Sequence, residues 1–328
     1  MYIVAESLDD LLRKSFRALL KRGQLTSPTK GSAVEIQGVS LRLKSPLARL
    51  SRTDSRGILF SCLGEWLWYM SGSNGLPFIQ YYIRDYDKFS DDGKTIHGGY
   101  GPRILGPTPN DQLDRVIELL RRKTDTRRAV IQVYDKADLL QDYEDIPCTC
   151  TLQFLVRNNE LTLHASMRSN DAYVGLPHDV FAFTMLQEYV AKRLGVQLGD
   201  YRHYAASFHL YSKDREKAQR FIDEGIQDFV QMPSMPDRDI EASLRGLLNL
   251  ESNFRTGDFL DVEALPLEPY WKDLARILEI YALSKANMNL KVNPIYRRMN
   301  FPVYRMYIRK RIPQAGHRPQ GDLFTNKH

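Results

Sequence analysis

The residues with the clearest chemical potential lie in the middle third of the 328-residue chain. They are Thr-Arg-Arg at 126–128, Pro-Cys-Thr-Cys at 147–150, Arg-Ser-Asn-Asp at 168–171, Gly-Leu-Pro-His-Asp at 175–179 and His-Leu-Tyr at 209–211. Arginine guanidinium groups are forked donors that match phosphate oxygens, and a positive setting shifts a cysteine toward its nucleophilic thiolate. A thiolate beside a phosphate site indicates chemistry on a nucleotide.

Each motif taken alone also has a structural explanation. A cysteine after a proline is most often a small buried hydrophobic residue. A pair of arginines is most often solvated or salt-bridged, and a histidine on a strand is most often a core or surface residue. The functional interpretation therefore depends on the motifs occurring together.

Together the motifs resemble the core of the thymidylate synthase family, over about residues 124–212. Paired arginines, Pro-Cys, a nearby glutamine, Arg-Ser-x-Asp, Gly-Leu-Pro and His-x-Tyr follow in the family's order. GEWLWY at 64–69 resembles the family's catalytic glutamate helix, and HGGYG at 97–101 resembles its substrate-side tyrosine loop. Little similarity is seen beyond about residue 225. The resemblance implies an α+β, thymidylate-synthase-like fold, a large mixed sheet flanked by helices, with one sheet face packed in a homodimer.

The resemblance also implies how a pyrimidine nucleotide is held. Cys148 would attack C6 of the base, and Arg168 and Ser169 would bind the 5′-phosphate. Arg127 and Arg128 would reach that phosphate from the neighbouring subunit, which is the reason to expect a homodimer.

The remaining implied roles concern the sugar and the proton transfers. His209 and Tyr211 would hydrogen-bond the 3′-hydroxyl, and Gln153 would support the site. Tyr100 would assist proton removal at C5, and Glu65 would organise water for acid and base steps.

The implied co-substrate is 5,10-methylenetetrahydrofolate, which Asp171 and Gly175 would face, and no metal is implied. Pyrimidine C5 is a poor nucleophile, and thiolate addition at C6 turns it into an enamine-like carbon that attacks an electrophilic methylene. Glu65 lies in the apolar segment 57–71, so a raised pKa is expected, which fits a proton shuttle. The alternative is a buried carboxylate capped by backbone donors.

One departure from the family concerns the base. The family closes the Gly-Leu-Pro segment with asparagine, and this chain has Asp179 there. Asparagine can donate to O4 and accept from N3–H of uracil, whereas a carboxylate only accepts and so matches the N4 amino group of cytosine. Asp179 therefore joins the expected catalytic set and predicts CMP or dCMP, as in the cytidylate hydroxymethylases that the sequence also resembles. The rival interpretation is a thymidylate synthase that methylates dUMP.

Two further departures concern the folate and the phosphate. IRDYDKF at 83–89 lacks the tryptophans that thymidylate synthases place against the folate, so water could replace the folate hydride and give a 5-hydroxymethyl product and tetrahydrofolate. The alternative is that Tyr86 or Phe89 replaces the missing indoles. In SPTKGS at 27–32, Lys30 would replace the family's phosphate-binding arginine.

The elements that must position these residues follow from periodicity and turn chemistry. The predicted elements are helices at 7–22, 57–71, 110–123, 179–194 and 213–225, a loop at 23–33, and strands at 34–43, 129–135, 150–159, 160–169 and 199–211. The turn RNNE makes a hairpin of the third and fourth strands. We expect a catalytic core at 1–225, a divergent helical part of the same domain at 226–312, and a polar tail at 313–328.

Composition narrows the class of protein. A net charge of +6 fits an anionic substrate, and three cysteines without a zinc-ligand pattern indicate reduced thiols. The absence of a signal-like or membrane-length apolar run leads us to expect a cytoplasmic protein. The basic, tyrosine-containing segment 295–311 leaves open an inactive family member that binds RNA, although nucleic acid is not the favoured partner.

Overall fold

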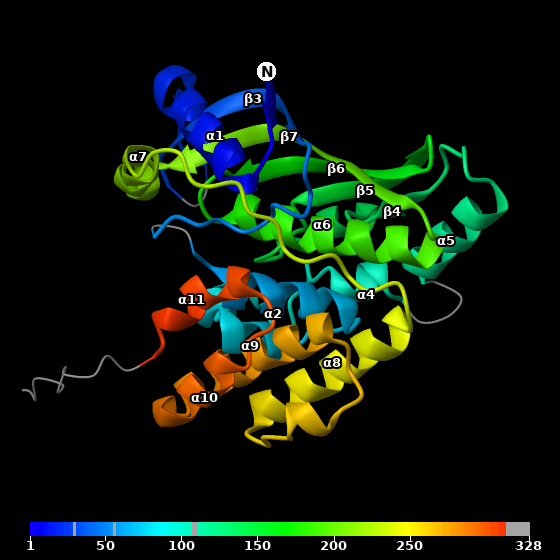
Figure 1. Cartoon of the computed structure of the whole chain (residues 1–328). Helices are drawn as coiled ribbons and strands as arrows, with labels where there is room; N and C mark the ends of the chain where they lie inside the picture. The colour runs from blue at the N-terminus through cyan, green and yellow to red at the C-terminus, as the bar shows by residue number, and fades with distance from the viewer. Residues whose placement is uncertain (29–30, 55–56, 107–110, 313–328) are drawn as a thin grey trace, which may run out of the picture. The chain divides into compact units, whose positions relative to one another are not determined.

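The computed structural model describes residues 1–28, 31–54, 57–106 and 111–312 (Figure 1). The chain divides into two compact units, Met1–Asn249 and Leu250–His328. The predicted boundaries at 225 and 312 stay a prediction, and both Lys30 and the predicted tail at 313–328 lie outside the described residues.

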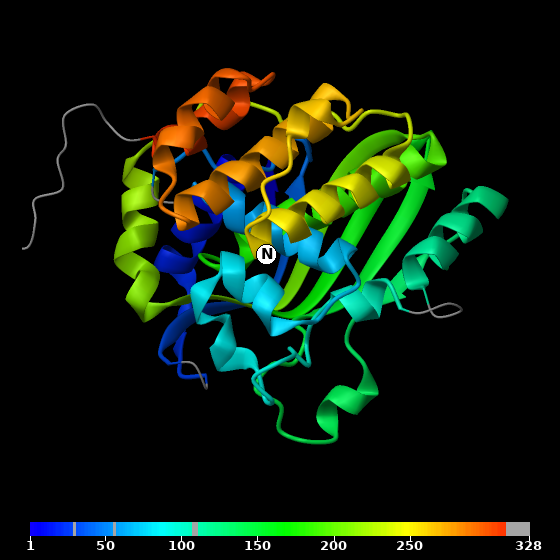
Figure 2. The same cartoon turned by 90° about the horizontal axis from the view of Figure 1, so that it is seen from below.

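A mixed sheet forms the centre of the first unit. Its strands in the described residues are β1 (Tyr2–Ala5), β2 (Gln24–Thr26), β3 (Ala33–Leu43), β4 (Val130–Gln132), β5 (Thr149–Arg157), β6 (Glu160–Asp171) and β7 (Gln197–Tyr211). They lie in the order β1-β3-β7-β6-β5-β4, with β2 paired to β3. β1 is parallel to β3 and β6 is parallel to β7, whereas the other neighbours are antiparallel. Seen from below, the strands are twisted and curved (Figure 2).

Helices flank this sheet. The first unit contains α1 (Leu8–Arg22), α2 (Leu59–Met70), α3 (Leu76–Tyr82), η1 (Arg84–Phe89), α4 (Gly101–Ile104), α5 (Gln112–Arg122), η2 (Lys136–Leu139), α6 (Gly175–Leu194), η3 (Ser212–Asp214) and α7 (Arg215–Asp223). α6 packs on β6 and β7 and also on α2. The predicted α+β class, with one large mixed sheet flanked by helices, is confirmed.

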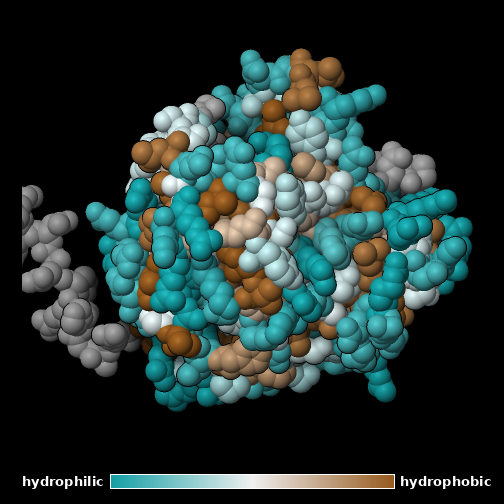
Figure 3. Space-filling view, turned by 90° about the horizontal axis from the view of Figure 1, so that it is seen from above, coloured by the Kyte–Doolittle hydropathy of each residue, from teal (hydrophilic) through white to brown (hydrophobic). Residues whose placement is uncertain are grey.

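Burial alternates along β6 as expected for a sheet with one covered face. Leu161, Leu163 and Ala165 are buried, whereas Thr162 and His164 between them are half-buried. Apolar side chains also reach the surface elsewhere, and on the face seen from above brown apolar groups are interrupted by teal polar ones (Figure 3).

Several predicted elements are confirmed for the predicted reasons. The Ser7 hydroxyl accepts from the Asp10 amide and begins α1. The turn between β5 and β6 places Asn158 and Asn159 at φ of 52° and 63°, the positive values of a tight hairpin turn.

Two predictions at the edges of the sheet were wrong. Within the predicted loop 23–33, Gln24–Thr26 pairs with β3 and forms β2, because the partner strand rather than local sequence supplies its hydrogen bonds. The strand predicted at 129–135 is only β4, since the Val133 and Tyr134 amides both donate to the Cys150 carbonyl at a bulge and the ladder stops there.

The second unit is helical, as the sequence predicts. α8 (Ile240–Thr256) crosses the boundary, and η4 (Val262–Ala264), α9 (Pro269–Lys285), η5 (Asn289–Lys291), α10 (Val292–Arg297), η6 (Pro302–Tyr304) and α11 (Arg305–Arg309) follow. Tyr304 and Tyr307 are buried, so these two tyrosines of the basic segment 295–311 are core residues and offer no stacking surface to nucleic acid. No helix in the described part of the chain is long and apolar enough to cross a membrane.

Candidate active site

Cys148 stands at the entry to β5, half-buried and outside any disulfide. Arg168 on the neighbouring β6 fixes the turn before it, because its Nε donates to the Pro147 carbonyl at 3.0 Å and its Nη2 to the Ile146 carbonyl at 2.8 Å. The Arg168 amide donates to the Cys148 carbonyl at 2.9 Å. The predicted phosphate-binding arginine and the predicted nucleophile are therefore held together, with the arginine exposed.

The parallel pair β6–β7 gathers more of the predicted residues at the same end of the sheet. Asp171 lies opposite His209, and Ser169 lies opposite Ser207. The rings of His209 and Tyr211 meet edge to face at 4.9 Å. Burial, followed by the charges of Asp171 and Cys148, raises the pKa of Tyr211, which places its hydroxyl near both groups.

The helices contribute two buried carboxyl groups. Glu65 on α2 is 7% exposed, and burial followed by the charge of Asp179 raises its pKa to about 8. The Tyr69 hydroxyl, one turn further along α2, donates to Glu65 Oε1 at 3.0 Å, and Glu65 Oε2 is buried without a hydrogen-bond partner. The predicted rise in the pKa of Glu65 is confirmed, and among the described residues no backbone donor caps the carboxylate.

Asp179 on α6 is the second buried carboxyl. Burial raises its pKa to about 7, although the Asn170 Nδ2 donates to its Oδ2 at 2.7 Å and opposes that rise. Gly175 lies directly against this pair, because a Cβ there would come within 3.3 Å of Asn170 Nδ2 and 3.5 Å of Asp179 Oδ2. The predicted folate contact of Gly175 stays a prediction.

Tyr100 connects the helix side to the nucleophile. Its ring stacks on Tyr69 at 4.9 Å, and its hydroxyl accepts from the Thr149 amide at 3.2 Å, directly after Cys148. Burial, followed by the charges of Asp179 and Cys148, raises its pKa well above the ordinary value. A thiol, two carboxyl groups and a phenol therefore share one cluster, in which both carboxyl groups can exchange protons near neutral pH.

Comparison with known proteins agrees with this constellation. A profile of the thymidylate synthase family matches residues 21–247. The chain belongs to the thymidylate synthase family. The match continues past residue 225, where the sequence alone shows little similarity, and it covers every predicted site residue.

Three phage proteins named deoxyuridylate hydroxymethyltransferase are similar to the chain. The protein of Bacillus phage SP01 is 31% identical over 210 residues, 60% of this chain and 55% of the relative. That of Pseudomonas phage M6 is 34% identical over 167 residues, 50% and 48% of the two chains, and that of Delftia phage PhiW-14 is 29% identical over 203 residues, 58% and 56%. The chain spans about half the length of these curated relatives.

The segment where thymidylate synthases carry tryptophans is aromatic in another way. Tyr86 on η1 meets the buried Trp68 edge to face at 5.7 Å and Phe89 at 5.4 Å. Burial, followed by the charges of Glu65 and Asp145, raises the pKa of Tyr86 well above its ordinary value. Aromatic rings thus occupy this segment, and whether they line the folate stays a prediction.

Arg127 and Arg128 lie away from this cluster within one chain. Both are exposed just before β4, where Gln153 Nε2 donates to the Arg127 carbonyl at 2.9 Å. Because Val130 pairs with Gln153, the strand spacing puts Arg128 about 20 Å along β5 from Cys148. The structure therefore separates these arginines from Arg168 in the same chain.

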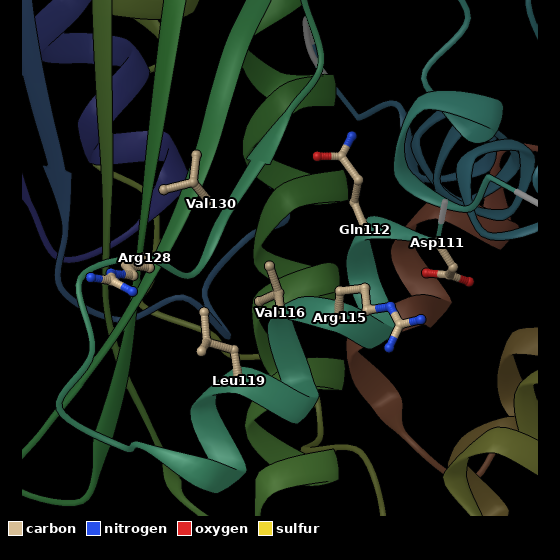
Figure 4. Close-up of a pocket in the computed structure, with 7 residues that line it drawn as sticks. All are labelled: Asp111, Gln112, Arg115, Val116, Leu119, Arg128 and Val130. Atoms are coloured by element: carbon tan, nitrogen blue, oxygen red, sulfur yellow. The ribbon is translucent and has the colours of Figure 1, made fainter. Parts of the chain in front are cut away.

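Arg128 lines a surface pocket of about 420 Å³ instead. The other lining residues come from α5, from the residue that precedes this helix, and from β4. They are Asp111, Gln112, Arg115, Val116, Leu119 and Val130. In Figure 4, Arg128 and Arg115 lie on opposite sides of the apolar Val116 and Leu119. This arrangement has no counterpart among the predicted roles.

Sequence reasoning missed three residues of the cluster. Tyr69 could have been found, since it lies four residues after Glu65 on one helix face. Asn170 had no signal in the strand pattern, because the alternation along β6 puts it on the face of Thr162 and His164, and yet it is buried. Asp145 gave no signal in the spacing, and the structure sets its carboxylate against Gly98, where a Cβ would come within 2.4 Å of Oδ2. Within the described residues, no three His, Cys, Asp or Glu side chains are arranged to hold a metal ion.

Proposed function

We propose that the chain transfers the one-carbon unit of 5,10-methylenetetrahydrofolate to C5 of CMP or dCMP, with addition of water. The products are the 5-hydroxymethyl nucleotide and tetrahydrofolate. The observation that carries the choice of base is Asp179, a buried carboxyl where the family has an amide donor. When ionised, it accepts from the N4 amino group of cytosine and repels O4 of uracil.

Cys148 supplies the nucleophile in this proposal. Its thiolate adds to C6 of the base, which makes C5 nucleophilic, and the C6–S bond is broken again at the end of the reaction. Arg168 holds the turn before Cys148 and remains exposed, so its guanidinium can also meet a phosphate.

The folate supplies an electrophilic methylene at the level of formaldehyde. Tyr86, Phe89 and Asp171 are the residues that would hold it, as rings and a partly exposed carboxylate beside the cluster. The aromatic rings of Tyr86 and Phe89 suit the aromatic ring system of the folate.

Water completes the product in this account. Once C5 has attacked the methylene, removal of the C5 proton, which Tyr100 would assist, and loss of tetrahydrofolate leave an exocyclic methylene on C5. A hydroxide equivalent from water then adds to that carbon while the other proton of the water goes to a nearby base. Glu65 serves as this base, because it has an oxygen without a partner and a pKa of about 8. The charges of Asp145 and Asp179 help to raise that pKa.

A second copy of the chain completes the phosphate site in this proposal. Arg127 and Arg128 are exposed and distant from Arg168 in their own chain, so they are available to a partner. The partly exposed face of the sheet would form the contact.

Deoxyuridylate is the second candidate substrate. Three relatives carry that substrate in their names. Because the pKa of Asp179 is about 7, its neutral form can also donate to O4 and accept from N3–H of uracil.

The test is to incubate the protein with methylenetetrahydrofolate and CMP, dCMP or dUMP in turn, and to weigh the nucleotide product by mass spectrometry. A gain of CH2O on a cytidine nucleotide supports the proposal. A gain of CH2O or of a methyl group on dUMP alone contradicts it. Cys148→Ala is the control that must give no product.

A further inference from the structure

We infer that Asn170 is a positioning residue that sets the choice of base by keeping Asp179 ionised and oriented. The inference rests on the proposed function and deepens it, because it names what makes a buried aspartate selective. Asn170 is the last residue but one of β6 and Asp179 lies on the second turn of α6, so one hydrogen bond ties the strand to the helix.

The geometry of the pair is specific. Asn170 Nδ2 donates to Asp179 Oδ2 at 2.7 Å, and the two residues are 4% and 9% exposed. An amide N–H stabilises a carboxylate more than a carboxylic acid, and burial makes that difference larger. With Oδ2 occupied, Oδ1 is the oxygen left to accept from the base.

The amide is held in one orientation at a cost. Asn170 Oδ1 is buried without a hydrogen-bond partner, and a buried acceptor that is left unpaired destabilises the folded state. If the amide were flipped, Asn170 Oδ1 would face the ionised carboxylate, and the two oxygens would repel each other. Gly175 leaves the room that the pair needs, since a larger residue would press on both side chains.

The other titratable groups around Asp179 do not stabilise its charge. In the described part of the chain they are Glu65 and Tyr69 on α2, Tyr86 on η1, Tyr100 before α4, Asp171 on β6 and Tyr201 on β7. The charge of Asp171 raises the pKa of Asp179, whereas the hydrogen bond from Asn170 lowers it.

The protonation state decides which bases are accepted. Ionised Asp179 accepts from cytosine N4–H and opposes uracil O4, whereas neutral Asp179 pairs with either base through one donor and one acceptor. Discrimination against dUMP therefore increases as the pH rises through the pKa of Asp179. Without Asn170 this increase moves to higher pH.

The experiment measures kcat/KM for dCMP and for dUMP between pH 5.5 and 8.5, a range chosen as about 1.5 units either side of neutrality. The ratio of the two cancels the shared titration of Cys148. In Asn170→Leu, which keeps the side-chain volume, we expect the ratio at pH 7.5 to fall about 10- to 100-fold and its midpoint to move to higher pH. The same variant in an Asp179→Asn background should leave the ratio unchanged.

Asn300→Leu is the matched control. Its Nδ2 donates to Asp273 Oδ1 at 3.0 Å, so the substitution breaks an asparagine–aspartate bond in the second unit. We expect this variant to keep the wild-type ratio and midpoint. If Asn170→Leu does not fold, Asn170→Ser is measured for the same ratio by equilibrium binding of dCMP and dUMP.

The outcomes separate the inference from the proposed function. If the wild-type protein modifies cytidylate and the Asn170 variant that folds keeps both ratio and midpoint, the inference is overturned and the function stands. An equal fall in the Asp179→Asn background also overturns it, because the effect is then structural. If the wild-type protein modifies no cytidine nucleotide, the function fails first and the inference with it.

Discussion

The turn before Cys148 and the pair of helix carboxyl groups differ in how far their polar atoms are already paired. Arg168 donates to two carbonyls of the turn that leads to Cys148. Around the carboxyl groups, Glu65 on α2 and Asn170, the β6 residue that bonds Asp179, each keep a buried oxygen without a hydrogen bond. The turn is therefore preformed, whereas the carboxyl groups lie beside unmet polar atoms that a substrate can complete.

The pKa values follow the same division. Burial raises the pKa of Glu65 to about 8 and that of Asp179 to about 7, so both helix carboxyl groups titrate near neutrality. We expect substitutions at the Cys148 turn to change the chemical step, and substitutions around the two carboxyl groups to change pH dependence and the choice of base as well.

The largest effect is expected at the nucleophile. Cys148→Ala should lower kcat by at least about 10⁴-fold, because the carbon–sulfur bond that activates C5 cannot form. Steady-state assays with dCMP measure the loss. Cys150→Ala, two residues along the same strand, is the control and should keep most activity. Substantial turnover by Cys148→Ala would show that Cys148 is not the nucleophile.

Glu65→Gln should lower kcat by about 10²- to 10⁴-fold, as expected for loss of a general acid and base. It should also change stability with a defined sign. The unfolded carboxyl ionises above its ordinary pKa of 4.5, whereas the folded one keeps its proton up to a pKa of about 8. The contribution of Glu65 to the free energy of unfolding is therefore fully present below pH 4.5, and it is lost as the pH rises to about 8.

Replacing Glu65 removes this loss. Relative to the wild-type protein, Glu65→Gln should gain roughly 3–5 kcal/mol between pH 4.5 and pH 8.5, measured by denaturant unfolding at both values. An equal difference in stability at the two pH values would show that Glu65 is not the buried acid described.

A mixture of inactive variants tests the separation of Arg127 and Arg128 from Cys148. Cys148→Ala and the double variant Arg127→Ala, Arg128→Ala should each be inactive, and an equal mixture should recover about a quarter of wild-type activity. After random exchange, half of the dimers contain one subunit of each variant. In such a dimer one of the two sites has both Cys148 and the two arginines. No recovery after subunit exchange would contradict the shared phosphate site.

The smallest effect is expected at Tyr69. Tyr69→Phe keeps the ring that stacks on Tyr100 and removes the donor to Glu65, so the pKa of Glu65 should rise further. We expect a loss of less than about 10-fold in kcat and an upward shift of the acidic limb of the pH profile, which reports ionisation of the base Glu65. Tyr189→Phe, which loses a hydroxyl bonded to Arg193, is the control. If this limb of the pH profile does not shift in Tyr69→Phe, then the Tyr69 hydroxyl has no influence on the pKa of Glu65.

The sequence predicts best the features that local chemistry determines. The Ser7 cap begins α1 as predicted, and the two asparagines of the β5–β6 turn give the expected hairpin. β2 and the short β4 were mispredicted, because a partner strand and a bulge, neither of which has a local sequence signal, set their limits.

The site divides along the same line. The motifs identified Cys148, Glu65 and Asp179, because each belongs to a spaced pattern. Asp145 and the bond between Asn170 and Asp179 depend on how distant elements pack, which no single motif contains.

The most direct test of the account is a competition between equal concentrations of dCMP and dUMP at pH 8, for the wild-type protein and Asp179→Asn. The product ratio gives the ratio of the two kcat/KM values. We predict that the wild-type protein makes mainly 5-hydroxymethyl-dCMP and that Asp179→Asn shifts the ratio toward the uridylate product by about 100-fold or more. A wild-type preference for dUMP that Asp179→Asn leaves unchanged would contradict the account.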